Sequence, residues 1–451
     1  MRVLLVSTYD LGRQPFGLAS PAAWLRADGH EVTLADLARS PLPALFGNEP
    51  GLVGFFLPMH TATRLALPVL ERLRAALPKA HFCAYGLYAP LNEEALRAAG
   101  VGTILGGEFE EGLRELARHP DAAPPRVSLA RQQFLVPDRA GLPPLREYAQ
   151  LAAGEERKLA AHTEASRGCK HLCRHCPVVP VYGGAFRIVQ REVVLEDIRR
   201  QVAEGAEHVT FGDPDFFNGP GHAMALVEAL HQEWPALTYD VTVKISHLLD
   251  HRELLPKLKE TGCLFVTSAV ESLDDEVLER LAKGHTRADF EEALGLMREA
   301  GLRLSPTFIP FTPWTTRESY REFLRSLVDL NLADQVAPIQ LAIRLLITQG
   351  SLLLDLPEVR ARAAEFDAEA LFYPWRNEDP WLDELSREAQ RLVAREERSG
   401  APRLEIFRRI WDLAGAGDWP LREDGAPRDA APHLTEAWYC CAEPEEGLRI
   451  L

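Results

Sequence analysis

Cysteine is scarce in this chain, whose 451 residues include only seven cysteines and only four methionines. A chain of this length buries large hydrophobic cores, so it needs no disulfides to fold. No long apolar run appears at the N-terminus, where MRVLLVSTYD is too short for the apolar region of a signal peptide. We therefore expect a cytoplasmic protein, in which clustered thiols bind metals or react rather than form disulfides.

Positive charge is also in short supply. The 50 lysine and arginine residues stand against 66 aspartate and glutamate residues, which gives a formal net charge of −16. This balance argues against a nucleic-acid groove or an anionic membrane as the main partner. The 46% of hydrophobic and 26% of charged residues are typical of a globular protein.

Two regions of the sequence alternate apolar strand-like runs with amphipathic helical runs, which predicts an α/β fold. Residues 1–118 are expected to form a doubly wound N-terminal domain. Residues 119–160 are rich in proline and charge and are expected to be a linker. Residues 161–349 are expected to form a partial (β/α)6 barrel, and residues 350–451 a helical C-terminal region with a loose tail.

The barrel rests on six predicted strand segments: 162–168, 207–213, 237–246, 263–272, 302–310 and 334–346. Chemistry in such barrels takes place at the carboxyl ends of the strands and in the loops that follow them. The stretch SRGCKHLCRHCP, residues 166–177, lies just after the first of these strands.

This stretch places Cys169, Cys173 and Cys176 in the spacing C-x3-C-x2-C. A structural zinc site normally has four protein ligands, and no matching pair of cysteines or histidines follows. His171 and His175 lie inside the loop, so a mononuclear zinc site stays open as an alternative. A [4Fe-4S] cluster held by three thiolates would leave one iron free to bind a substrate.

This spacing, after the first strand of a β/α barrel, resembles the radical S-adenosylmethionine (radical SAM) superfamily. The resemblance implies a [4Fe-4S] cluster on Cys169, Cys173 and Cys176, whose fourth iron binds the amino and carboxylate groups of SAM. An electron from the cluster then breaks a carbon–sulfur bond of SAM. It also implies an external one-electron donor as a partner.

The resemblance places SAM contacts on further strand ends of the predicted barrel. Asp213 would bind the SAM amino group, with a helix cap or turn as its alternative role, and Lys244 the carboxylate, with a surface position as its alternative. A charge in the sixth strand needs a partner, and a ligand carboxylate would supply one for Arg344. The implied cofactor contacts are Gly212, Asp213, Lys244, Ser268, Glu271 and Arg344.

Residues 1–118 look like the cobalamin-binding domain of one radical SAM class. The family's cobalt-binding histidine loop is absent, since STYDLG offers only Asp10, but many members hold cobalamin without that histidine. The usual Gly-Gly after the fourth strand is replaced by AYGLYAP, where the family places the nucleotide tail. Bound cobalamin and a domain kept only as a scaffold are the two alternatives.

The tail WYCCAEP, residues 438–444, contains the adjacent pair Cys440 and Cys441. A reduced pair can bind one soft centre such as a trivalent metalloid, and a packing role is the alternative. The whole chain resembles the CUAEP/CCAEP-tail radical SAM proteins, some of which carry selenocysteine at the position of Cys441. This resemblance implies that Cys441 is a catalytic, reactive atom and Cys440 its resolving or chelating neighbour. Cys83 and Cys263 are expected in the core.

Taken together, these features predict a radical SAM transferase that moves a methyl or 3-amino-3-carboxypropyl group to a small-molecule substrate. The acceptor would be an arsenic or selenium species held by Cys440 and Cys441. Two alternatives stay open. One is a cobalamin-dependent methyltransferase, and the other is a binding protein that senses metalloids or redox state through an iron–sulfur cluster.

Overall fold

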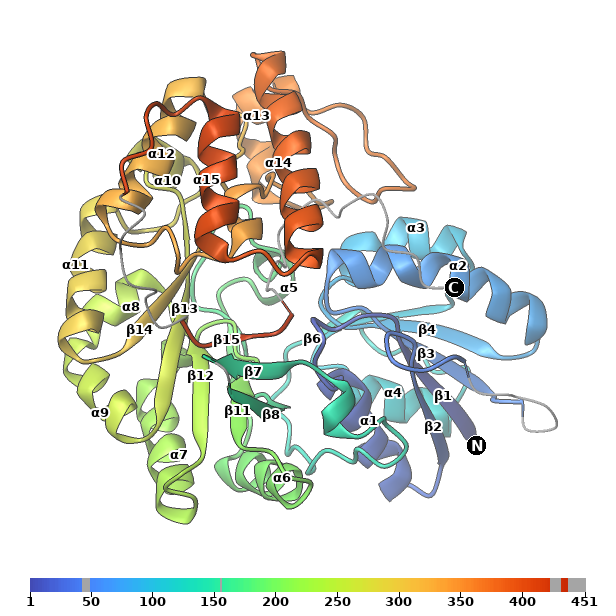
Figure 1. Ribbon diagram of the computed structural model, residues 1–451. Helices are drawn as coiled ribbons and strands as arrows, with labels where there is room; N and C mark the ends of the chain where they lie inside the picture. The colour runs from blue at the N-terminus through green and yellow to red at the C-terminus, as the bar shows by residue number, and fades with distance from the viewer. Residues whose placement is uncertain (43–48, 155, 422–430, 437–451) are drawn as a thin grey trace.

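The computed structural model describes residues 1–42, 49–154, 156–421 and 431–436. An N-terminal α/β domain stands beside a curled β/α half-barrel, and a helical C-terminal region covers one end of the half-barrel (Figure 1). The α/β fold expected from the alternating pattern is thus confirmed. Within the described residues, no helix is both long and apolar enough to cross a membrane.

The N-terminal domain is a parallel sheet with strand order β2-β1-β3-β4-β5-β6. Leu4 and Val6 of β1 belong to one hydrophobic core, whereas Val3 and Leu5 belong to the core on the opposite face. Successive strand residues point to opposite faces, so helices that cover both faces bury all four. The elements are β1 (Arg2–Ser7), α1 (Phe16–Ala27), β2 (Glu31–Asp36), β3 (Leu52–Phe56), α2 (His60–Ala76), β4 (His81–Tyr85), α3 (Glu93–Ala98), β5 (Thr103–Gly107), α4 (Glu110–Arg118) and β6 (Val127–Ser128).

The half-barrel is a seven-stranded sheet with order β14-β13-β12-β11-β8-β7-β15. Its five middle strands, β8 and β11 to β14, are parallel, and β7 pairs antiparallel with β8. The elements are β7 (Gln150–Ala153), β8 (Glu156–Thr163), β9 (Ser166–Gly168), α5 (Val179–Tyr182), β10 (Phe186–Ile188), α6 (Arg191–Ala203), β11 (His208–Phe211), α7 (Pro220–Glu233), β12 (Thr238–Thr242), α8 (Ile245–Asp250), α9 (Leu255–Glu260), β13 (Cys263–Glu271), α10 (Asp275–Arg280), α11 (Arg287–Glu299), β14 (Arg303–Phe308) and α12 (Arg317–Asp329).

The sixth predicted strand, residues 334–346, is reduced to one parallel bridge between Phe311 and Arg344. Pro338 begins a short 3-10 helix in this segment (Pro338–Leu341). Proline cannot donate a ladder hydrogen bond, which explains why a regular strand does not form here. The half-barrel therefore stays open on the side next to β14.

The predicted linker, residues 119–160, contributes β6, β7 and the first part of β8 to the two sheets. It also packs on both domains: Ala149 N donates to Gly12 O at 2.8 Å, and Arg139 pairs with Asp197 at 2.9 Å. Its role as a separate linker stays a prediction.

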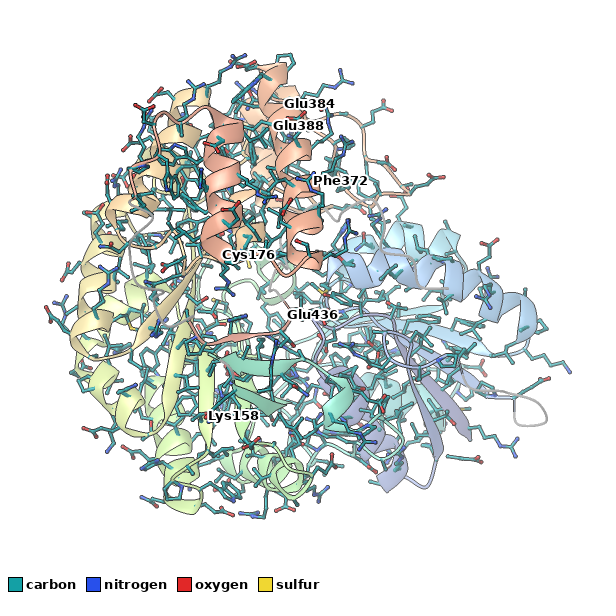
Figure 2. All side chains as sticks on the ribbon, in the orientation of Figure 1. Lys158, Cys176, Phe372, Glu384, Glu388 and Glu436 are labelled. Atoms are coloured by element: carbon teal, nitrogen blue, oxygen red, sulfur yellow. The ribbon has the colours of Figure 1, made fainter. Side chains whose placement is uncertain are left out.

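The C-terminal region contains α13 (Pro357–Arg362), α14 (Pro380–Arg398) and α15 (Arg403–Ala414). Strand β15 (His433–Leu434) then returns to pair with β7. Glu436, the last described residue, makes an ion pair of 3.1 Å with Arg39 of the N-terminal domain. Cys176 and Glu436 both lie in the central part of the molecule (Figure 2).

Candidate metal and cofactor site

The three clustered cysteines lie on the loop between β9 and α5, at the carboxyl end of the half-barrel, and none of them forms a disulfide. The loop leaves β9 at Gly168, whose φ is +77°. A Cβ at this position would lie 2.5 Å from Ala185 O, so the antiparallel pair β9 and β10 needs glycine here. Neighbouring elements fix the loop, since Lys170 N donates to Asn218 Oδ1 at 3.1 Å and Arg174 N to Leu281 O at 2.9 Å.

The spacing of the three sulfur atoms bears on the kind of metal that they can hold. Among the described residues, one group of three or more metal-binding side chains has all its ligand atoms within 4.8 Å of one another, and it is Cys169, His171 and Asp215. At least one pair of the three loop sulfurs is therefore farther apart than 4.8 Å. Two sulfurs bound to one zinc at about 2.3 Å each cannot be farther apart than about 4.6 Å. The loop thus fits a multi-iron cluster better than a single zinc ion.

Cationic side chains surround this loop. Lys283 is buried, and although burial lowers its pKa, the charges of Glu271, Cys173 and Cys176 raise it overall. The pKa of Lys244 is lowered by burial, with Cys173 among the charges that oppose the shift. Burial also raises the pKa of the Cys169 thiol to about 11. A bound metal would therefore have to displace the proton of this thiol.

Glu271 lies at the end of β13, where the register shifts and the residue adopts a φ of +72°. Its Oε1 lies 3.1 Å from His175 Nε2 and 3.4 Å from Lys283 Nζ. Burial alone would raise its pKa, but Lys283 and His175 lower it to about 2. The carboxylate thus ties the strand end to the cysteine loop, and its predicted contact with SAM stays a prediction.

Asp213 and Gly212 follow β11. Both carboxylate oxygens of Asp213 accept hydrogen bonds, from Ala165 N at 2.9 Å and from Ser166 Oγ at 2.6 Å. Burial raises the pKa of Asp213 to about 7. A Cβ on Gly212 would lie 2.6 Å from His162 Nε2, so glycine is required for the close approach of this ring. Asp213 connects β11 to β9, and the predicted SAM contacts of both residues stay predictions.

Ser268 and Arg344 also have protein environments of their own. Ser268 is fully buried, and it points away from the inside of the barrel because its neighbour Thr267 faces inward. Arg344 donates to Asp383 at 2.8 Å and lies 3.6 Å above the ring of Trp375. The buried arginine thus has a protein carboxylate as its partner, where the sequence predicted a ligand carboxylate.

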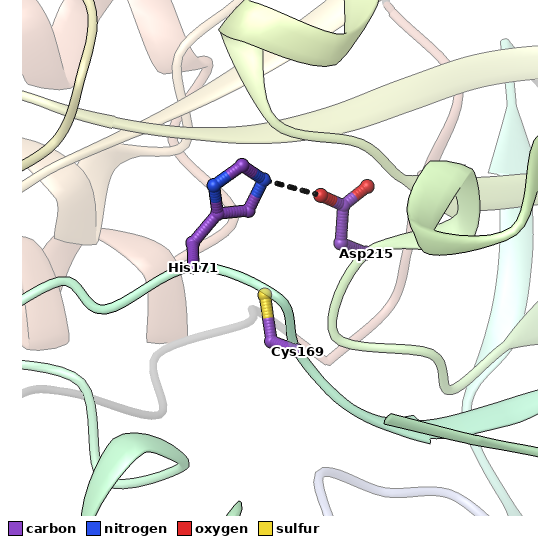
Figure 3. A group of neighbouring side chains, drawn as sticks. All are labelled: Cys169, His171 and Asp215. Atoms are coloured by element: carbon purple, nitrogen blue, oxygen red, sulfur yellow. Dashed lines mark ion pairs between the residues drawn. The ribbon is translucent and has the colours of Figure 1, made fainter. Parts of the chain in front are cut away.

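Three residues that sequence reasoning missed as a set lie next to Cys169. Asp215 Oδ2 is 2.7 Å from His247 Nδ1 and 3.4 Å from His171 Nε2, and the His171 and His247 rings are 4.6 Å apart (Figure 3). His171 comes from the cysteine loop, Asp215 follows β11 and His247 lies in α8. The second carboxylate in GDPDFF was the one signal in the sequence, because a carboxylate after a strand lies at the catalytic end of a barrel.

The half-barrel encloses a cavity of about 500 Å³. Side chains of β12, β13 and β14 form one wall, including Thr242, Thr267 and Thr307. The end of α14, the start of α15 and residues 433–436 line the other side, with Glu436 among them. The described part of the C-terminal segment therefore ends at the cavity. The tail residues Cys440 and Cys441 lie outside the described residues.

Three aromatic rings fill the space between the N-terminal sheet and helices α1 and α4. The rings of Phe56, Tyr85 and Phe109 are buried, with centroids 5.0 to 6.1 Å apart. Tyr85 Oη donates to Gly17 O of α1 at 2.9 Å. A cobalamin nucleotide tail buried beneath the sheet does not fit among these side chains. Cobalamin bound only at the carboxyl ends of the strands stays a prediction.

Comparisons with known proteins agree with this geometry. Residues 163–327 match the family described as the radical SAM superfamily. The hopanoid C-3 methylase of Methylococcus capsulatus is 27% identical over 334 residues, which are 69% of this chain and 64% of that protein. The chain therefore spans less than two thirds of this relative.

Two solved structures share the fold. The cobalamin-dependent SAM radical enzyme OxsB, with aqua-cobalamin bound, has a TM-score of 0.66 at 15% identity, over 88% of this chain and 67% of that chain. The radical SAM methyltransferase TsrM from Kitasatospora setae, with cobalamin and a [4Fe-4S] cluster bound, has a TM-score of 0.57 at 18% identity, over 74% of this chain and 70% of that chain. The alignment with OxsB covers too much of this chain to be confined to the half-barrel.

Proposed function

Because residues 163–327 form a domain of the radical SAM superfamily, we propose that the protein is a transferase that moves an alkyl group from SAM to a substrate. One observation carries this proposal: three unpaired thiols share one loop at the carboxyl end of the half-barrel, with sulfurs too widely spaced for one zinc ion. Cys169, Cys173 and Cys176 would hold a [4Fe-4S] cluster. The methylase relative favours methyl as the group transferred, with 3-amino-3-carboxypropyl as the alternative.

The residues of the chain would hold and orient the reactants. Bound cluster and SAM supply the one-electron chemistry that breaks a carbon–sulfur bond. Lys244, close enough to Cys169 and Cys173 for their charges to act on it, would neutralise the SAM carboxylate. Lys283 would offset the negative charge of the thiolates from its buried position. The cavity, with its wall of threonine side chains, would receive the substrate and limit its contact with water.

SAM cleavage by the full chain tests this proposal. Anaerobic protein, reconstituted with iron and sulfide, is incubated with SAM and dithionite, and the products are separated by chromatography. We expect either 5'-deoxyadenosine or 5'-methylthioadenosine, and the product identifies which carbon–sulfur bond breaks. The Cys176→Ala variant is the matched control and should form neither. If the wild-type protein forms neither product although its cluster is loaded, catalysis is excluded and the sensing alternative is favoured.

Methyl transfer through cobalamin is the second candidate, and the coverage of both domains by the OxsB alignment favours it. The full chain would be expressed with supplied cobalamin and desalted. A cobalamin absorbance band that survives desalting supports this candidate, and loss of the band contradicts it.

A metalloid acceptor is the finer part of the proposal. It falls on Cys440 and Cys441, and none of the relatives named above is described with such an acceptor. What supports it is position: Glu436 lines the cavity, and a fully extended chain gains at most about 3.6 Å per residue. Cys441 is therefore covalently limited to about 18 Å from Glu436.

A further inference from the structure

The carboxylate of Asp215 is buried between two imidazoles and hydrogen-bonds to neither. Its Oδ1 accepts a hydrogen bond from Phe217 N at 3.2 Å, which fixes the orientation of the group. Its Oδ2 faces His247 Nδ1 and His171 Nε2, and these three atoms are all buried without a hydrogen-bond partner among the described residues. Buried polar atoms without partners are costly. A cation bound between the three atoms would satisfy them together.

Cys169 supplies a fourth donor atom. Its Sγ, the His171 ring and the Asp215 carboxylate form the group whose ligand atoms lie within 4.8 Å of one another (Figure 3). Two imidazole nitrogens, one carboxylate oxygen and one thiolate are a donor set typical of zinc, which takes four such ligands. Mg²⁺ and Ca²⁺ prefer oxygen ligands and do not fit this set.

We propose that Cys169, His171, Asp215 and His247 bind one Zn²⁺ ion in protein that lacks the iron–sulfur cluster. The ion displaces the proton of the Cys169 thiol, and no electron is transferred. Cys169 is also a proposed cluster ligand, so the two metal states exclude each other. The only link to the proposed function is this shared cysteine, and zinc binding itself does not depend on SAM cleavage.

Cobalt in place of zinc gives a spectroscopic test. Full-length protein without a cluster is stripped of metal with a chelator under anaerobic conditions and titrated with Co²⁺. We expect one Co²⁺ per chain, with the visible ligand-field bands of a four-coordinate site and a thiolate-to-cobalt charge-transfer band. Added Zn²⁺ should remove both features. A chain that binds no stoichiometric Co²⁺ or Zn²⁺ overturns the proposal.

Variants then separate this site from metal bound by the three loop thiols. Cys169→Ser should abolish the charge-transfer band, and His247→Ala or Asp215→Asn should weaken Co²⁺ binding by more than about tenfold, since even an outer-shell partner is worth that much. Cys173→Ser and Cys176→Ser are matched controls that should keep the spectrum. The opposite pattern, with binding lost in Cys173→Ser and kept in His247→Ala, assigns the ion to the loop thiols and overturns the proposal.

A second control lies next to His247. The His251 ring is 5.9 Å from the His247 ring, and its Nδ1 faces Glu253 at 3.9 Å rather than Asp215. His251→Ala should therefore bind Co²⁺ as tightly as wild type. Circular dichroism checks the fold of each variant, and His247→Gln replaces His247→Ala if the latter is unfolded.

Competition between the two metal states gives an independent measurement. Preloading with Zn²⁺ should lower the iron content of wild-type protein after reconstitution with iron and sulfide, and should lower it less in His247→Ala. Equal iron content with and without Zn²⁺ in wild type would show that the two metals do not share Cys169. Failure of SAM cleavage alone would leave this result unchanged, so the two proposals fail separately.

Discussion

Glu271 adopts a backbone conformation that side chains other than glycine rarely adopt, and it does so in the middle of the candidate site. Such a conformation costs about 1–3 kcal/mol and persists where the surroundings determine it. Here the register shift in β13 directs the carboxylate to His175 and Lys283. The strained backbone thus places a negative charge between the cysteine loop and a buried lysine.

Removal of Lys283 should destabilise the protein. Lys283→Met leaves the Glu271 carboxylate buried next to His175 alone, and loss of one partner of a buried ion pair typically costs about 3–5 kcal/mol. Urea unfolding measures the change, and the double variant Lys283→Met with Glu271→Gln should recover part of it. The pKa of Glu271 lies at about 2, below its ordinary 4.5, so its stabilisation is present above pH 4.5 and is lost as the pH falls towards 2. A stability unaffected by Lys283→Met would contradict this account.

The tail cysteine gives a second prediction for a single residue. We expect Cys441→Ser to abolish turnover of the substrate while SAM binding persists, because a serine hydroxyl is a far weaker nucleophile and metal ligand than a thiolate. Equilibrium binding of SAM and product formation are measured on the same preparation. Unchanged product formation would exclude a catalytic role for this residue.

At this scale, the sequence showed what is local and missed what is not. Cys169, Cys173 and Cys176 could be recognised because a single loop contains all three, with a spacing that is itself the signal. His171, Asp215 and His247 come from three segments, and only the folded half-barrel brings them together. Arg344 was recognised as a charge that needs a partner, but Asp383 lies in a helix whose position no local pattern reveals.

Among the elements, the hairpin of β9 and β10 positions the cysteine loop. Gly168→Ala would place a methyl group 2.5 Å from Ala185 O in a left-handed backbone conformation, so we expect the loop to shift and the iron content after reconstitution to fall. Gly183→Ala is the matched control, because Gly183 also has a positive φ, of +55°, but has open space around a new Cβ. Equal iron content in the two variants would show that the close contact at Gly168 does not matter.

The elements themselves were largely predictable. Apolar strand runs and glycine-terminated helices gave both α/β regions, since side-chain periodicity is fixed by the backbone of each element. The exception is the segment 334–346, which is as apolar as a strand but contains Pro338. Periodicity reports burial, and burial alone does not ensure that a strand forms.

For the molecule as a whole, Arg167 connects the two domains. It lies two residues before Cys169 and pairs with Glu110 at 2.7 Å and Glu108 at 3.3 Å, both from the N-terminal domain. Its guanidinium also lies 5.0 Å from the ring of Phe109. Arginine suits this place because its planar group offers five donors and remains charged when buried.

Arg167→Met should therefore separate the two domains energetically. The buried carboxylates of Glu108 and Glu110 would lose their partner, and we expect a cost of about 3–5 kcal/mol. Arg317→Met is the control, since its pair with Asp379 is exposed and should matter little. Thermal unfolding compares the two, and similar losses in both variants would contradict a special role for Arg167.

The pH dependence of stability follows from buried carboxyl groups near the domain interface. Burial raises the pKa values of Asp10, Glu108 and Asp213 to about 7. The folded protein then binds more protons than the unfolded chain between these values and the ordinary values of 3.8 to 4.5, so the free energy of unfolding should rise as the pH falls from above 7 towards 4.5. The urea midpoint measures this, and Glu108→Gln should flatten the profile. A midpoint that falls across this range would exclude the effect.

The contacts between the two domains restrict how the cavity can open. The chain passes between them through residues 119–149, the Arg167 ion pairs join them next to the cysteine loop, and Glu436 joins them again through Arg39 beside the cavity. Lobes fastened at three separate points cannot swing apart about a single hinge. A substrate must therefore enter by small local displacements of the segments that line the cavity, which keeps the reacting groups in register while it passes.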